Sequence, residues 1–425
     1  MVKSIVQSIF ARAFVAAVNL LILVATSRYL GVSSRGEISL FVLNIAIIQG
    51  LSDVYTGYGI LRFIPRTNLH KVILNGLLFA FSVVSISNLL LNRLHTQIEG
   101  YEWMGYLISL LVVLNTFNCV LIMGKQKIGW YNAMSMLQPA LLILFIAIAV
   151  FGFRIYTFEA YVFPLFASFA MATLISSWLV YKLSRTGSGV ISQISMKEIL
   201  LNGLLYQSSA ILLMLCNRIS YYLITNKAGL GLYSSATVLT ESVLIISSAL
   251  APLLMTTVAN QTSETGSIRI SVSLARLSFI LVSLAMVVVL LIPESFYLWF
   301  IGLGFKGIKS IMLAYFPAVI CAGFIAVLSA YFTAKSLQKV VLFTYLLGFI
   351  SALLLSPFLI RYFGLHGAAY SADLAYFLVC VSMLFAFRKQ AKQGLFHLFF
   401  TGGNSLALKQ IVNKVNAGSS ATQVE

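Results

Sequence analysis

The chain has 425 residues, of which 60% are hydrophobic and only 9% are charged. A soluble domain of this length needs far more charge to cover its surface, so most of this surface must face lipid. The net charge of +17 does not indicate nucleic acid, because the basic residues form short clusters between apolar runs and no single basic face.

Apolar runs of about 20 residues are long enough to cross the hydrocarbon core as helices. The predicted fold class is therefore an all-α polytopic membrane protein with about twelve spans. Two six-helix bundles at 1–181 and 199–387 are joined by a cytoplasmic linker at 182–198 and followed by a basic cytoplasmic tail at 388–425. The predicted spans are 8–27, 37–59, 72–92, 103–123, 129–151, 160–181, 199–225, 232–256, 270–292, 311–333, 340–360 and 366–387.

The distribution of lysine and arginine predicts the orientation, because cytoplasmic loops of membrane proteins carry the excess of positive charge. With the N-terminus in the cytoplasm, most of the 28 basic residues fall on the cytoplasmic side. An even number of spans then places the C-terminus there as well. The outer exceptions are Arg28, Arg35, Arg93, Arg154, Lys227, Lys306, Lys309 and Arg361.

The two halves show a weak internal repeat at the start of the second helix of each half. Leu30-Gly31 and Gly36 open the first of these helices, and Gly229 to Tyr233 opens the second. Aligning Gly36 with Gly231 gives a period of 195 residues. An even number of helices per half makes the repeats parallel, which is typical of transporters whose substrate site lies between the halves.

Intramembrane carboxylates are informative because a charge at a helix centre costs roughly 2.5–3.5 kcal/mol on insertion scales. Asp53 shares one helical face with Gln49, Ser52 and Thr56, and Glu241 shares a face with Ser234, Thr237 and Ser248. The hydroxyls could simply join helices. We expect Asp53 and Glu241 to line one internal cavity. Asp373 shares a face of the last predicted helix with Tyr370 and Tyr376, and it could pair with a basic residue or bind a cation.

Polar residues also line up on the first and seventh predicted helices. Arg12, Asn19 and Thr26 are spaced seven apart, although Arg12 could snorkel to the cytoplasmic surface. Arg218 shares a face with Gln207 and Thr225, near Asn217, Tyr221 and Tyr222, and lies several residues from either predicted helix end. Snorkelling is harder there, so Arg218 is the stronger candidate for a cavity residue.

Neither an enzyme nor a metal site is expected. No loop is long enough for a catalytic domain, and the histidines have no partner at ligand spacing. Each of Cys119, Cys216, Cys321 and Cys380 lies in an apolar run, where a cysteine behaves as a small hydrophobe.

The opening of the chain carries a family resemblance. Arg12, then Asn19-Leu20-Leu21, then Ser27 to Gly31, then Arg35-Gly36 resembles the start of the Wzx-type polysaccharide flippases of the MATE-like (MOP) superfamily. The twelve spans and basic cytoplasmic loops fit that family along the whole chain. The peptidoglycan-precursor flippases of the superfamily usually have two more helices, which this chain lacks in the prediction.

The resemblance implies a flippase in the bacterial inner membrane. Such proteins move undecaprenyl-pyrophosphate-linked oligosaccharides, for O-antigen, capsule or exopolysaccharide, by alternating access, and could contact polysaccharide-assembly proteins. Membrane potential favours outward movement of an anion by about 2.3 kcal/mol per charge per 100 mV, and Na⁺ or H⁺ coupling through Asp53, Glu241 or Asp373 is the other driving force. The residues expected to bind substrate are Arg218, Arg12, Arg28, Asn19, Gln207, Tyr221 and Tyr222.

Two other readings stay open. A MATE-type multidrug/cation antiporter would need a cavity dominated by carboxylates, whereas the candidate residues of this chain include both acidic and basic side chains. A membrane scaffold of a polysaccharide assembly complex would transport nothing.

Overall fold

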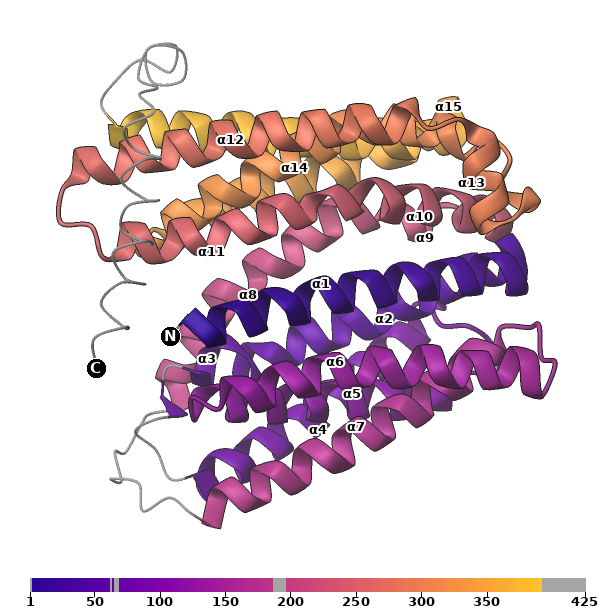
Figure 1. Cartoon of the computed structure of the whole chain (residues 1–425), viewed down its shortest axis with the longest axis horizontal. Coiled ribbons are helices and arrows are strands. Elements are labelled where there is room, and N and C mark those ends of the chain that lie inside the picture. The colour runs from indigo at the N-terminus through magenta and orange to yellow at the C-terminus, as the bar shows by residue number, and fades with distance from the viewer. Residues whose placement is uncertain (1, 62, 65–68, 186–195, 392–425) are drawn as a thin grey trace. The chain divides into compact units, whose positions relative to one another are not determined.

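The structure is a computed structural model that describes residues 2–61, 63–64, 69–185 and 196–391. Within these ranges it is built from helices and short connections, with no strand (Figure 1). Ten of the described helices are long and apolar enough to cross a membrane, judged by length and composition. The prediction of an all-α polytopic membrane protein is confirmed.

Two of these ten helices are twice the length that a bilayer needs. One runs over Phe10–Leu61 and has 52 residues, and the other runs over Gln338–Ala391 and has 54. The first is interrupted at Gly31, with φ 82°, and the second at Gly364, with φ 58°. Such angles favour glycine, which has no Cβ to clash. Each long helix therefore divides into two spans, and the ten helices correspond to the twelve predicted spans.

Among the helices before residue 196, α5 packs against α2, α4, α6 and α7 (Figure 1). A π-helical turn, η1 (Thr26–Leu30), joins α1 to α2, and a second one, η3 (Ile148–Gly152), ends α6. The α-helices are α1 (Val2–Ala25), α2 (Gly31–Thr56), α3 (Tyr58–Leu61), α4 (Leu69–Arg93), α5 (Glu102–Gly124), α6 (Ile128–Ala147) and α7 (Glu159–Arg185).

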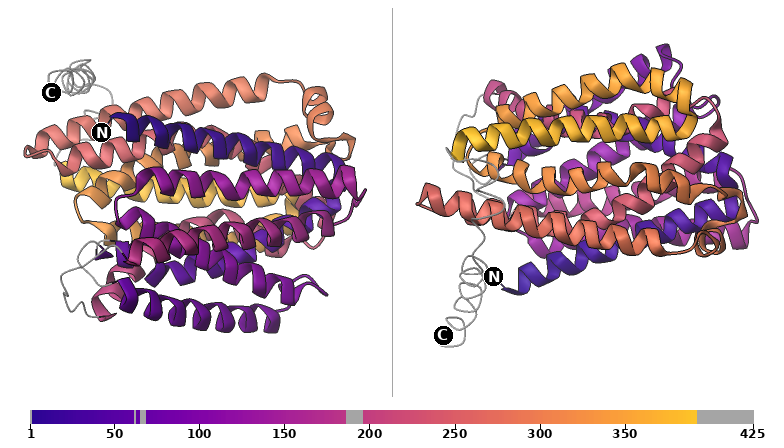
Figure 2. Two further views of the ribbon diagram at one scale, coloured as in Figure 1. Left: turned by 60° about the horizontal axis from the view of Figure 1, so that its bottom comes forward. Right: turned by 90° about the horizontal axis from the view of Figure 1, so that it is seen from above.

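The remaining helices contain more breaks than the apolar runs predict. A turn at Ile219 separates α8 from α9, and the 3-10 segment η4 (Ser242–Leu244) separates α10 from α11. The elements are α8 (Met196–Arg218), α9 (Ser220–Leu223), α10 (Lys227–Glu241), α11 (Ile245–Ala259), α12 (Glu264–Leu291), α13 (Glu294–Ile301), η5 (Leu303–Phe305), α14 (Ile308–Ala334) and α15 (Gln338–Ala391). Figure 2 shows the same helices in two further views.

The chain forms two compact units. The first comprises Lys3–Ala236 with Glu294–Ile308, and the second comprises Thr237–Pro293 with the described chain from Lys309 onward. The first unit thus includes α8, α9 and the start of α10, which the sequence assigned to the second half. The division at 182–198 stays a prediction, because residues 186–195 lie outside the described ranges, as does the predicted tail from residue 392.

Two of the apolar clusters that hold the first unit together lie at opposite ends of α2 and α5. One joins Ile22 and Phe41 to residues of α5, α6 and α7 near Val112 and Ile146. The other surrounds Phe117 and Tyr55 at the opposite end of α2 and α5. Because lipid is as apolar as these side chains, tight packing rather than removal from water stabilises them. The clusters leave a polar gap between α2, α5, α6 and α8.

The repeat predicted from Gly36 and Gly231 is visible in the contact between α2 and α10. A Cβ atom on Gly36 would lie 2.0 Å from the carbonyl oxygen of Lys227, and one on Gly231 would lie 1.9 Å from that of Val32. Val32 and Lys227 are themselves 195 residues apart, and each lies four positions before the glycine of its own helix. Each glycine therefore contacts the residue that occupies the equivalent position in the other half. The hydroxyl of Ser39 donates to that of Ser234, 195 residues further on, at 2.7 Å. The parallel repeat therefore has a symmetric contact at this crossing, which only glycine permits.

Candidate functional site

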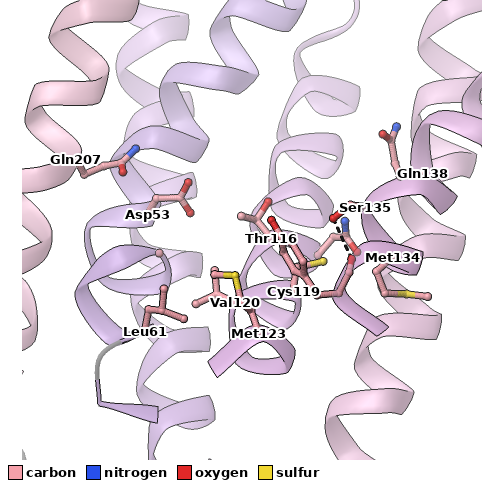
Figure 3. Close-up of a pocket in the computed structure, with 13 residues that line it drawn as sticks. Asp53, Leu61, Thr116, Cys119, Val120, Met123, Met134, Ser135, Gln138 and Gln207 are labelled. Atoms are coloured by element: carbon pink, nitrogen blue, oxygen red, sulfur yellow. Dashed lines mark hydrogen bonds between the residues drawn. The ribbon is translucent and has the colours of Figure 1, made fainter. Parts of the chain in front are cut away.

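A cavity of about 310 Å³ lies inside the first unit, between α2, α5, α6 and α8. Figure 3 shows Asp53 and Gln207 on one side, Ser135 and Gln138 on the other, and Thr116 with Cys119 between them. Tyr131, Met123 and Met134 also line it. No lysine or arginine lines this cavity among the described residues. It is a polar pocket with a single carboxylate.

Asp53 is the charged group of this pocket. Its Oδ1 accepts a hydrogen bond from the hydroxyl of Thr56 at 3.3 Å, and Gln49 lies one helical turn earlier on the same face. Gln49 in turn donates to the hydroxyl of Thr116 at 3.3 Å. Within the described chain Asp53 forms no ion pair. A carboxylate held this way needs a proton, a cation or a hydroxyl ligand from the pocket.

A second polar site gathers around two arginines near the start of α2. Arg218 donates to the hydroxyl of Tyr221, and its guanidinium carbon lies 5.1 Å from the centre of that ring. Arg35 donates to the hydroxyl of Thr26 at 3.5 Å, and it lies within electrostatic reach of Arg218, Tyr221 and Tyr161. The buried Nε of Arg35 has no hydrogen-bond partner among the described residues. We call Arg35, Arg218, Tyr161 and Tyr221 the arginine cluster.

The cluster corrects two expectations about its arginines. Arg218 was placed well inside a continuous span, but α8 ends at Arg218 and a turn follows at Ile219. Arg35 was counted as an outer loop charge, because the second span was expected to begin at 37. Helix α2 begins at Gly31, directly after η1, so Arg35 lies inside the helix. The run of Leu30-Gly31 followed by Gly36 was the signal that could have extended the helix to include it.

The α2–α10 crossing carries a second pair of polar contacts besides Ser39 and Ser234. The ammonium of Lys227 lies 2.6 Å from the carboxylate of Glu37. Lys227 is well exposed, so this ion pair alone stabilises the crossing by at most about 1 kcal/mol. We call Glu37, Ser39, Lys227 and Ser234 the crossing contacts. They lie at the end of the unit where α2 begins, which the orientation rule predicts to face outside.

The other predicted substrate-binding residues are dispersed. Arg12 and Asn19 are exposed on α1, and the exposed Arg28 donates to the carbonyl oxygen of Trp299 at 3.4 Å. Tyr222 donates to Oδ1 of Asn44 at 2.5 Å. Of the predicted set, Gln207 lies in the pocket, and Arg218 and Tyr221 lie in the arginine cluster.

The remaining carboxylate candidates have partners in the second unit. Glu241 accepts a hydrogen bond from the hydroxyl of Tyr315 at 2.8 Å. Asp373 accepts one from the backbone amide of Ala318 at 2.8 Å, directly after Pro317 in α14. Asp53 is thus the candidate that lines the described pocket. That Asp53 and Glu241 line one common cavity stays a prediction.

The sequence matches no protein-family model and no curated protein, but the fold resembles solved membrane transporters. A lipid II flippase, MurJ, in an inward closed conformation has a TM-score of 0.69 at 14% identity and covers 96% of both chains. An outward-facing multidrug resistance MATE family transporter of the MOP superfamily has a TM-score of 0.65 at 14% identity, over 92% of this chain and 96% of that one. The Vibrio cholerae MATE transporter VcmN in its bent form has a TM-score of 0.58 at 14% identity, over 93% of this chain and 98% of that one.

Identities this low establish the fold alone. The match to a lipid II flippase extends over nearly all of that chain, so the smaller number of predicted spans does not separate the two folds. The expectation of a MATE-like architecture is confirmed: the chain has the fold of the lipid II flippase MurJ and of MATE transporters.

Proposed function

We propose that the protein is a flippase that moves a lipid-linked, pyrophosphate-bearing oligosaccharide across the bacterial inner membrane, with both termini in the cytoplasm. The observation that carries this proposal is the arginine cluster, where the buried Nε–H of Arg35 has no hydrogen-bond partner among the described residues and the guanidinium of Arg218 lies within electrostatic reach. The similarity to a lipid II flippase supports it. Undecaprenyl-pyrophosphate-linked units for O-antigen, capsule or exopolysaccharide are the proposed substrates.

The chemistry of the cluster suits an anion of high charge. Two guanidinium groups within electrostatic reach repel each other, and a buried donor without a partner costs about 1–3 kcal/mol. A pyrophosphate placed between them relieves both costs, because the planar fork of arginine binds phosphate oxygens with two parallel hydrogen bonds. The phenols of Tyr161 and Tyr221 add hydroxyl donors beside the site.

A MATE-type antiporter of organic cations is the second candidate function. The observation that favours it is the pocket around Asp53, where a carboxylate has no cationic partner among the described residues. The two functions need opposite charges on the substrate. The charge of the transported molecule therefore separates them.

Purified protein in proteoliposomes should translocate a fluorescent lipid-linked oligosaccharide pyrophosphate faster than protein-free vesicles do. The flipped fraction is measured by the loss of fluorescence when a membrane-impermeant quencher is added. A lipid-linked sugar without the pyrophosphate and a cationic dye serve as controls. Transport of the dye without transport of the pyrophosphate lipid would establish the antiporter, and transport of neither would contradict both proposals.

Coupling to Na⁺ or H⁺ through Asp53 is proposed beside the membrane potential as the driving force. The Asp53→Asn variant should retain flipping driven by the potential but lose its dependence on an imposed ion gradient, because the amide carries no charge for the ion. The matched control is Glu264→Gln, which changes an exposed carboxylate at the start of α12. Unchanged ion dependence in Asp53→Asn would leave the potential as the driving force.

A further inference from the structure

We infer that the pocket around Asp53 is a sugar subsite that binds a neutral or amino sugar and rejects a uronic acid. This inference rests on the proposed function, because the sugar is taken to be part of the transported headgroup. It adds the specificity of the site, which the arginine cluster cannot provide since every pyrophosphate-linked glycan carries the same phosphates.

The size of the pocket leaves room for much more than a bare ion. A volume of about 310 Å³ far exceeds the roughly 10–15 Å³ that a single water requires. The described residues contain no group of three or more histidine, cysteine, aspartate or glutamate side chains placed to hold a metal ion. The space is therefore suited to a polyatomic ligand.

The groups around the pocket can both donate and accept hydrogen bonds, as sugar hydroxyls do. The amide of Gln207 has no hydrogen-bond partner in the described structure and faces the space from α8. Gln138 donates from its amide nitrogen to Ser168 at 3.3 Å, which leaves its oxygen as an acceptor. Asp53 accepts from Thr56 through Oδ1, and its second oxygen adds another acceptor. These groups come from opposite walls, so a ring between them can be bound on both edges (Figure 3).

The remaining walls suit the carbon skeleton of a sugar. Met123, Met134 and Val120 supply an apolar surface in the same pocket. A pyranose ring presents C–H groups on its faces and hydroxyls at its edges, and most small-molecule sites combine apolar walls with a few polar groups in this way.

The charge of the pocket sets the preference among sugars. Asp53 is its charged side chain, and no lysine or arginine of the described chain lines it. A uronic acid would place a second carboxylate near Asp53 without a compensating cation, which is unfavourable in a site removed from bulk water. An amino sugar would gain an ion pair, and a neutral sugar would use the carboxylate as an acceptor.

Cys119 supplies a probe of this pocket that needs no transport, because its thiol is one of the lining groups. The test uses the full-length protein with Cys216, Cys321 and Cys380 replaced by alanine. Reaction of Cys119 is followed with a cationic and an anionic methanethiosulfonate, each normalised to its rate with free cysteine. The cationic reagent should react about tenfold faster or more, and Asp53→Asn should abolish that preference. A protein that retains Cys216 alone is the matched control, because Cys216 is also buried but does not line the pocket.

Sugar binding is then read as protection of Cys119. Methyl glycosides of glucosamine and N-acetylglucosamine at millimolar concentration should slow the modification of Cys119, whereas the methyl glycoside of glucuronic acid should not. None of the three glycosides should affect the modification of Cys216. Gln138→Leu should weaken the protection. Absence of protection, equal protection by the glucuronide, or a Cys119 that no reagent reaches would each overturn the inference. If glycosides protect Cys119 but the vesicle assay shows no flipping, the sugar subsite is supported and the flippase proposal is contradicted. If the protein flips the lipid but glycosides give no protection, the flippase proposal is supported and the sugar subsite is contradicted.

Discussion

Replacing Arg218 with alanine should abolish flipping of the pyrophosphate-linked oligosaccharide while the protein still inserts into the membrane. The substitution removes one of the two guanidinium groups of the arginine cluster and the contact with Tyr221. Hydrogen bonds to charged groups contribute about 1.5–3 kcal/mol each, so losing a two-pronged pair should lower transport by a hundredfold or more on the scale of about 1.4 kcal/mol per tenfold. The measurement is the vesicle flipping rate divided by the amount of reconstituted protein.

The lysine variant and a second arginine sharpen this test. Arg218→Lys should keep part of the transport, because the charge survives but the planar fork does not. Arg35→Ala should lower transport as strongly, and the double alanine variant should be little worse than either, since both arginines are proposed to hold one anion. Arg361→Ala, which removes an exposed arginine of α15, is the control and should leave transport unchanged.

A structural role for Arg218 would give a different pattern. The sequence allowed Arg218 to be the ion-pair partner of Asp53 or Glu241, and within the described chain Asp53 forms no ion pair. If the arginine only stabilised the fold, Arg218→Ala would reduce the amount of folded protein and not the rate per molecule. Full transport by Arg218→Ala would remove the phosphate-binding role altogether.

A disulfide between α2 and α10 should arrest transport reversibly. The hydroxyls of Ser39 and Ser234 lie 2.7 Å apart, and the two helices touch backbone to backbone at Gly36 and Gly231. In an alternating-access flippase the substrate leaves at the outer end, so the crossing contacts there must separate. The double variant Ser39→Cys and Ser234→Cys, made in a protein without its native cysteines, should lose flipping on oxidation and regain it with a reductant.

The single variants Ser39→Cys and Ser234→Cys are the controls, because neither can form this disulfide and both should transport under oxidising conditions. Cross-linking is followed by the change in electrophoretic mobility after cleavage of the chain between α2 and α10. Undiminished transport by the fully cross-linked protein would show that the crossing does not open during the cycle. Breaking the Glu37–Lys227 ion pair would not replace this test, because an exposed ion pair contributes too little to hold the helices together.

The repeat and the charge pattern show how far the residues of this chain could be interpreted without coordinates. The alignment of Gly36 with Gly231 correctly identified the equivalent positions of the two halves, because a glycine is needed wherever two helix backbones touch. The polar face of Asp53 with Gln49 and Thr56 was also correct, because helical spacing fixes which side chains are neighbours. The sequence did not identify Arg35 as a helix residue, because a charged residue beside a glycine is typical of a loop. The positive φ of Gly31 allows α2 to begin ahead of Arg35.

The sequence by itself determined that this protein is an all-α membrane protein with a parallel repeat, because span length, low charge and backbone hydrogen bonding in lipid leave few alternatives. It also singled out Asp53, Glu241, Asp373 and Arg218 as candidates, because charged groups are costly inside a bilayer. Only the tertiary structure decided that Asp53 faces a pocket shared with Gln138 and Gln207, and that Arg35 and Arg218 form one cluster. These side chains lie on different helices, and helical periodicity fixes the faces of one helix but not which helices pack together.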